Sequence, residues 1–185
     1  MNPGRMTEFS ILAVCTANIC RSPMIELLLR KQLDPEKFTV GSAGVHGWNR
    51  APVDSMVTLE LARFGVRAAG FQSRALSDQL INDADLILAA TRDHRAHILG
   101  RSPDALRKTF TLLEFAALMD GSTAEPSVAA SPAQLVEESF KRRSQARKDL
   151  DLSDPYRQGP DIHRAVAEKA LAASRAGRVE KIATA

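Results

Sequence analysis

Aromatic side chains are scarce in this 185-residue sequence: they make up 5% of it and include one Trp and one Tyr. Proteins that bind single-stranded nucleic acids usually stack the bases on aromatic side chains, so this scarcity argues against that class of function. The net charge of +3 is also too small to indicate a nucleic-acid-binding surface. We therefore expect no nucleic-acid partner.

Long apolar runs are missing as well. The longest one near the N-terminus covers residues 11–14, which is far too short for a signal-peptide core or a membrane span. The sequence therefore predicts a cytoplasmic protein that does not enter a membrane.

Cysteine is rare, and Cys15 and Cys20 are the two that occur. Two cysteines cannot build a disulfide framework, and in a cytosolic protein such a pair is more often catalytic, redox-active or metal-binding. The histidines show no ligand spacing around these cysteines that would suit a metal ion. They are His46, His94, His97 and His163. We therefore predict no metal and no cofactor.

Strands and helices alternate in the pattern of apolar residues. Apolar runs with β-branched or aromatic members predict strands at residues 9–14, 38–43, 84–90 and 110–113. Helical spacing predicts helices at residues 23–33, 53–64, 96–99, 105–108, 134–150 and 160 to about 182. The alternation predicts an α/β fold of three layers, with a central parallel sheet of about four strands and helices on both faces.

Domain boundaries and repeats are not evident. Residues 120–133 are small, polar and proline-containing, which predicts a surface loop rather than a linker between domains. We expect a single domain over residues 1–185. The basic stretch KRRSQARK at residues 141–148 has two interpretations, a solvated helix face or a docking patch, and the first is favoured.

The stretch VCTANICRSP, residues 14–23, places a thiol, a guanidinium and a hydroxyl where a strand is predicted to turn into a helix. Loop amides and a helix N-terminus attract an anion, and Arg21 offers a planar set of donors that fits two phosphate oxygens. Such surroundings hold Cys15 as a thiolate, the nucleophile that phosphoryl transfer needs. An isolated cysteine in a strand usually packs in the core, but its combination with Arg21, Ser22 and Pro23 favours catalysis.

The spacing Cys-x5-Arg-Ser-Pro, here CTANICRSP, resembles the signature loop of the low-molecular-weight protein tyrosine phosphatases. Three further stretches stand in that family's order: SAGVHGW at 42–48, DLILAATRDH at 85–94 and DPY at 154–156. The resemblance covers nearly the whole chain, although residues 114–150 look longer and more variable than the compact family pattern. It implies one phosphatase domain.

The resemblance also implies roles for the loop residues. Cys15 would form a phosphocysteine intermediate, and Arg21 would bind the phosphate and stabilise its transition state. Ser22 would donate a hydrogen bond to the thiolate, and Asn18 would hold the loop in shape. The phosphate-binding residues would be Thr16, Ala17, Asn18, Ile19, Cys20, Arg21 and Ser22.

Asp154 would be the general acid that protonates the departing phenol and then the base that activates water. The residues alone leave the choice open among Asp149, Asp151, Asp154 and Asp161, and Pro155 distinguishes Asp154 because it stiffens the loop. Trp48 and Tyr156 are the single Trp and the single Tyr of the sequence, and they would line the substrate cleft. As loop residues they could equally be partly buried anchors.

Three positions invite a closer look. Ala17 stands where the family commonly has Gly, which would strain the loop if that position needs a positive φ. Arg157 stands where the family often has a second aromatic residue. Cys20 is either a small loop filler or, as the family suggests, the partner that traps oxidised Cys15 as a reversible disulfide.

The sequence thus predicts a metal-independent phosphatase that hydrolyses protein phosphotyrosine through a cysteinyl-phosphate. A tyrosine kinase of the same cell is one candidate substrate. An arsenate reductase of the same fold is less favoured, because it needs cysteines beyond Cys20. A phosphoarginine phosphatase is also less favoured, because relatives of that kind carry Thr where Ile19 stands. A non-enzymatic anion-binding module would be expected to lack Cys15 or Asp154.

Overall fold

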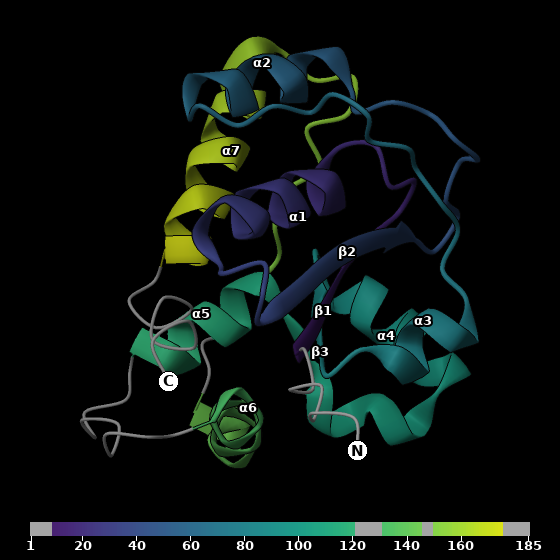
Figure 1. Ribbon diagram of the computed structural model, residues 1–185, viewed down its shortest axis with the longest axis vertical. Helices are drawn as coiled ribbons and strands as arrows, with labels where there is room; N and C mark the ends of the chain where they lie inside the picture. The colour runs from purple at the N-terminus through teal and green to yellow at the C-terminus, as the bar shows by residue number, and fades with distance from the viewer. Residues whose placement is uncertain (1–8, 121–130, 146–149, 176–185) are drawn as a thin grey trace, which may run out of the picture.

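A four-stranded parallel sheet forms the centre of the protein in a computed structural model, which describes residues 9–120, 131–145 and 150–175 (Figure 1). The strand order is β2-β1-β3-β4. The strands are β1 (Phe9–Cys15), β2 (Phe38–Gly44), β3 (Leu86–Ala89) and β4 (Thr109–Thr111). The predicted α/β class and the central parallel sheet of four strands are therefore confirmed.

Helices cover both faces of the sheet because successive side chains of a strand point to opposite faces. Ile11 and Ala13 of β1 belong to one core cluster, and Leu12 and Val14 belong to the other. The first cluster also contains residues of five helices: α1 (Arg21–Gln32), α2 (Ser55–Arg63), α5 (Leu112–Asp120), α6 (Pro132–Lys141) and α7 (Pro160–Arg175). The second cluster contains residues of α3 (Asp78–Asp83), α4 (Arg92–Arg101) and the 3-10 helix η1 (Pro103–Lys108).

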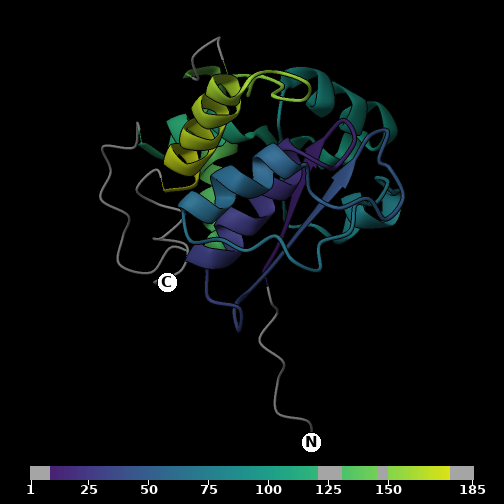
Figure 2. The same ribbon diagram turned by 90° about the horizontal axis from the view of Figure 1, so that it is seen from above.

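The two views agree on this layering. Figure 1 shows α1, α2 and α7 on one side of the sheet and α3 and α4 on the other. Seen from above in Figure 2, α7 still lies beside α1 and α2, with which it packs. None of the helices in the described residues is long and apolar enough to cross a membrane.

The carboxyl ends of the strands gather at one edge of the sheet. Val14 is in register with Ala43 of β2 and with Ala89 of β3. The segment that begins at residue 150 returns to the same edge, because the Leu152 N–H donates to the Ala90 carbonyl oxygen at 2.9 Å. Ligand sites of open parallel sheets lie at this edge.

Several predicted boundaries are wrong. The strand expected at 110–113 ends at Thr111, because Thr111 and Glu114 cap the N-terminus of α5 and make residues 112 and 113 helical. Helix α3 was not expected at all, since it is a single short segment of mixed polarity. The helix expected at 96–99 is longer and occupies all of α4, whose N-cap is the side chain of Thr91.

Other predictions fall partly outside the described residues. The helix expected at 134–150 ends as α6 at Lys141 and is followed by the 3-10 helix η2 (Arg143–Gln145), while residues 146–149 lie outside the description. The last helix, expected to reach about 182, is described up to Arg175. Of the loop expected at 120–133, residues 121–130 lie outside the description, and α6 already begins at Pro132.

Candidate active site

The loop between β1 and α1 is shaped by Asn18, which is buried and has a φ of 59°. This left-handed conformation suits Asn better than most other residues. Its side-chain amide donates to Ser22 Oγ at 2.9 Å and to Ser42 Oγ at 2.7 Å, and its carbonyl oxygen accepts the backbone N–H of Arg74 at 2.9 Å. Asn18, and not Ala17, is the residue of this loop that has a positive φ. Ala17 therefore causes no backbone strain, although the family commonly has Gly at its position.

Cys15 closes β1 and is buried at the base of the loop. Its Sγ lies 2.9 Å from Ser22 Oγ. Because Ser22 already accepts a hydrogen bond from Asn18, its own hydrogen can go to the sulfur or to the carbonyl oxygen of Ala43 at the longer distance of 3.3 Å. A thiolate at Cys15 would take that hydrogen, so Ser22 is placed to stabilise the anionic sulfur.

Arg21 is the buried cation of the site and begins α1. Its Nη2 donates to Asp154 Oδ2 at 2.6 Å and to Thr16 Oγ1 at 3.1 Å. Its Nε is buried and has no hydrogen-bond partner among the residues that the structure describes. A buried donor without a partner costs free energy, and an oxyanion above the loop would supply the missing acceptor.

The N-terminus of α1 adds to this positive potential. Cys20 occupies the N-cap position without a side-chain hydrogen bond to the helix, and the first turn contains no acidic residue. The amide groups and the partial positive charge of the helix end are therefore left for an anion.

His94 of α4 supports the loop from the side, a role that the sequence did not reveal. Its Nε2 lies 2.9 Å from Thr16 Oγ1, and its Nδ1 lies 2.7 Å from Thr91 Oγ1. Because Thr16 Oγ1 accepts from Arg21, its hydrogen is available to Nε2, which a neutral imidazole offers as an acceptor. Burial, assisted by the charge of Arg21, lowers the pKa of His94 to about 4 and keeps the ring neutral near pH 7.

A second layer of polar residues braces Asn18 through Ser42. The Ser42 hydroxyl donates to a carboxylate oxygen of Glu26, which is buried in α1 and pairs with Arg30 at 2.7 Å. Burial raises the pKa of Glu26 from its usual value. A signal for this layer was present in the sequence, because Glu26 is the single acid within the apolar stretch MIELLL.

Cys20 differs chemically from Cys15. Both thiols are buried and free. Burial, together with the nearby Asp54, raises the pKa of Cys20 to about 12. Cys20 is therefore a protonated thiol at neutral pH, which leaves Cys15 as the candidate nucleophile.

Asp154 is half exposed, with 50% of its side chain accessible to solvent. Of the aspartates considered as the general acid, it is the one that the structure shows in contact with Arg21. Asp151 instead pairs with Arg92, and Asp161 is an exposed residue in the first turn of α7. The remaining candidate, at position 149, lies outside the described residues.

The two predicted cleft residues lie together beside the proposed acid. The rings of Trp48 and Tyr156 meet edge to face with centroids 6.2 Å apart. The backbone N–H of Trp48 donates to the carbonyl oxygen of Ala17 at 3.1 Å, which attaches this aromatic residue to the loop. The guanidinium carbon of Arg157 lies over the Tyr156 ring, 5.1 Å from its centroid.

Within the described ranges, no group of three or more His, Cys, Asp or Glu side chains could hold a metal ion. A thiol, a guanidinium and a carboxylate instead surround a loop prepared for an oxyanion. Together with the parallel sheet, this arrangement defines the α/β proteins whose phosphate loop carries a Cys-x5-Arg motif.

The chain belongs to the low molecular weight phosphotyrosine protein phosphatase family, whose pattern matches residues 10–143. It is 44% identical over 100 residues to the low molecular weight protein-tyrosine-phosphatase Etp of Escherichia coli strain K12. That match covers 54% of this chain and 66% of Etp, slightly less than two thirds of the relative's length.

The chain is also similar to proteins named as arginine phosphatases. The chain is 38% identical over 118 residues to the protein-arginine-phosphatase of Geobacillus stearothermophilus, covering 64% of this chain and 78% of that protein. The solved structure of the YwlE arginine phosphatase from the same organism superposes with a TM-score of 0.72 at 29% identity, covering 94% of this chain and 92% of the other.

Proposed function

We propose that this protein hydrolyses phosphotyrosine in proteins through a cysteinyl-phosphate intermediate and without a metal ion. The observation that carries the proposal is the meeting of three groups at one edge of the sheet. Cys15 lies at the base of the loop, Arg21 keeps a buried Nε without a partner among the described residues, and Asp154 contacts Arg21 at 2.6 Å. Nucleophile, oxyanion binder and proton donor are what a phosphomonoesterase of this kind requires.

In the first proposed step, the Cys15 thiolate attacks phosphorus and the bond between phosphorus and the phenolic oxygen breaks. Asp154 gives its proton to the leaving oxygen, and Arg21 together with the loop amides binds the equatorial phosphate oxygens. Phosphate and Asp154 compete for the same guanidinium, so a bound dianion releases the carboxylate from its contact with Arg21. The released carboxylate takes up a proton from solvent, and this is the proton that it gives to the leaving oxygen. Binding therefore frees the acid at the moment when it is needed.

In the second proposed step, a water molecule attacks the phosphocysteine. Asp154, now ionised, takes a proton from that water, the bond between sulfur and phosphorus breaks, and the thiolate of Cys15 is restored as inorganic phosphate leaves. Ser22 stabilises the departing sulfur from 2.9 Å.

The substrate side of the site favours a phenol in three ways. Trp48 and Tyr156 provide aromatic surface for a tyrosine ring. The apolar Ile19 is buried in the loop, where a guanidinium leaving group would benefit from a polar partner. The exposed Arg157 beside Tyr156 adds a positive charge that suits acidic residues near the phosphotyrosine. We propose tyrosine-phosphorylated proteins as substrates, with a tyrosine kinase of the same cell as one candidate.

Phosphoarginine is the second candidate substrate, and the similarity to arginine phosphatases favours it. One experiment separates the two: parallel turnover of phosphotyrosine, phosphoserine and phosphoarginine peptides of one sequence, each with and without EDTA. We expect preference for phosphotyrosine and no effect of EDTA. A preference for phosphoarginine would replace the proposed substrate, and a preference for phosphoserine or a loss of activity with EDTA would overturn the mechanism.

We further propose that the chain acts as one phosphatase domain, since described residues from 9 to 175 build one sheet and its two helical layers. The two free cysteines support a cytoplasmic location, where thiols stay reduced.

A further inference from the structure

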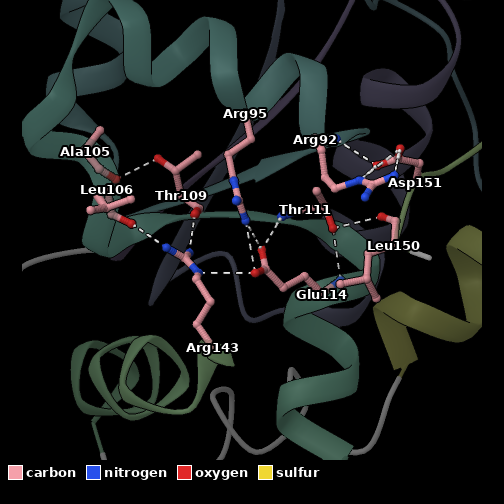
Figure 3. Close-up of polar contacts among 10 residues, drawn as sticks. All are labelled: Arg92, Arg95, Ala105, Leu106, Thr109, Thr111, Glu114, Arg143, Leu150 and Asp151. Atoms are coloured by element: carbon pink, nitrogen blue, oxygen red, sulfur yellow. Dashed lines mark hydrogen bonds and ion pairs between the residues drawn. The ribbon is translucent and has the colours of Figure 1, made fainter. Parts of the chain in front are cut away.

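The proposed acid belongs to residues 150–154, which we call the acid-bearing segment. Three consecutive residues of this segment, 150–152, form hydrogen bonds with the edge of the sheet. The carboxylate of Asp151 accepts the backbone N–H of Arg92 at 2.8 Å and pairs with its guanidinium (Figure 3). The backbone N–H of Leu152 donates to the carbonyl oxygen of Ala90 at 2.9 Å. Ala90 directly follows β3 and Arg92 begins α4, so these two contacts hold the segment beside the carboxyl end of that strand.

The third contact comes from the neighbouring strand β4. Thr111 Oγ1 donates to the carbonyl oxygen of Leu150 at 2.9 Å, and Thr111 is completely buried. The same hydroxyl oxygen accepts the backbone N–H of Glu114 at 3.1 Å, while Glu114 Oε2 accepts the backbone N–H of Thr111 at 3.2 Å. This reciprocal pair is a capping box. Because the oxygen already accepts a hydrogen bond, its one hydrogen is directed to Leu150.

Glu114 is itself held in place by two arginines. Glu114 is 3% exposed, and its carboxylate accepts two hydrogen bonds from Arg95 Nη1 of α4 at 3.0 and 2.9 Å. Arg143 of η2 lies on the other side, with Nε 3.2 Å from Glu114 Oε1 and its guanidinium carbon 4.2 Å from the centroid of the Phe110 ring. Figure 3 shows that both guanidinium groups contact the Glu114 carboxylate. A buried carboxylate with these partners has little freedom to move, so it fixes the orientation of Thr111.

We propose that Thr111, oriented by Glu114, is a positioning residue for Asp154: it fixes the start of the acid-bearing segment through Leu150. The proposal rests on the proposed function, because it requires Asp154 to be the general acid. Thr111 is completely buried and would act on the acid through Leu150, without contacting the substrate itself. Displacing a catalytic group by about 1 Å can slow a reaction roughly 100-fold, so one hydrogen bond at the base of the segment has a measurable effect.

The β4 strand offers a matched pair of variants. Thr111→Val removes the hydroxyl that binds Leu150 and keeps the shape of the side chain. Thr109→Val, two residues earlier, removes an equally buried hydroxyl, whose one hydrogen goes to the carbonyl oxygen of Ala105 at 2.8 Å and not to the acid-bearing segment. Thr111→Ser restores the hydroxyl of the first variant and lacks only a methyl group.

The measurement is kcat/KM for two substrates, a phosphotyrosine peptide and an aryl phosphate whose phenol leaves without help. This constant reports the steps up to cleavage of the phosphate ester, where the acid acts. For Thr111→Val we expect a loss of about 10- to 100-fold with the peptide and less than about threefold with the activated substrate. Thr109→Val and Thr111→Ser should keep the wild-type ratio. The ratio between substrates does not depend on how much of a preparation is folded.

Asp154→Asn separates the two hypotheses. It should show the same selectivity to a greater degree, and adding Thr111→Val to it should cause no further selective loss. An equal loss on both substrates in Asp154→Asn would overturn the role of Asp154 and with it the proposal. Selectivity in Asp154→Asn without selectivity in Thr111→Val, or equal effects of Thr111→Val and Thr109→Val, would overturn the role of Thr111 alone.

Discussion

Acidification should weaken the fold through His94, the imidazole that supports the phosphate loop. Burial and the charge of Arg21 lower the pKa of His94 from 6.5 to about 4, although Asp154, Asp93 and Asp151 favour its protonated form. In the unfolded chain the same imidazole binds its proton near its ordinary pKa. The stabilisation is therefore complete above pH about 6.5 and is lost as the pH falls toward about 4.

The two pKa values of His94 determine the size of the effect. Proton linkage between them lowers the free energy of unfolding by about 2 kcal/mol between pH 7 and pH 5. Solvent near the edge of the site screens part of this, so we expect roughly 1–2 kcal/mol. A His94→Gln variant supplies an acceptor for Thr16 near the position of Nε2 but cannot bind a proton in this range.

The assay is urea unfolding of both proteins at pH 5, 6 and 7, followed by circular dichroism. The carboxylates titrate in both proteins, so the difference between the two stability curves isolates the imidazole. The wild type should lose stability relative to His94→Gln as the pH falls. Parallel curves, or a wild type that gains stability on acidification, would refute the reasoning about burial and tautomer.

Three more outcomes are expected. Cys15→Ser should bind phosphate or vanadate but lose turnover, because a hydroxyl is a far weaker nucleophile; substantial residual turnover would move the nucleophile elsewhere. After peroxide and then a thiol reductant, Cys20→Ser should recover less activity than the wild type, in which mass spectrometry should find Cys15 linked to Cys20; equal recovery would leave Cys20 a packing residue. Asp154→Asn should bind inorganic phosphate more tightly than the wild type in inhibition assays, because the ion pair that competes for Arg21 is gone; weaker binding would contradict that competition.

Local patterns were enough to predict the parts of the fold that depend on neighbouring residues. The strand expected at 84–90 is found as β3, because a continuous apolar run suits a strand that is buried on both faces. The meeting of Cys15 with Ser22 was also predictable, since both belong to one loop. The contact between Arg21 and Asp154 spans 133 positions. Resemblance had implied a role for Asp154 in the same site, but nothing in the sequence predicted this contact.

Contacts between distant segments explain what the sequence did not reveal. His94 was considered as a metal ligand and found unsuitable, and nothing in its neighbourhood along the chain indicates Thr16 as its partner. The solvated face expected at 141–148 is wrong for Arg142 and Arg143, which bind carbonyl oxygens of α5, η1 and β4. Their positive charge alone predicts exposure to solvent, but both side chains are partly buried because α5, η1 and β4 pack beside them.

Two of these long-range contacts hold the acid-bearing segment, one at each end. Thr111 holds its start at Leu150, and Arg21 holds its far end, where Nη1 approaches the carbonyl oxygen of Leu152 at 3.5 Å and Nη2 binds Asp154. Binding of phosphate to Arg21 would release the far end and leave the start in place. The carboxylate would then pivot about a fixed base rather than drift into solvent, and such restricted motion is what keeps a proton donor within reach of the leaving oxygen.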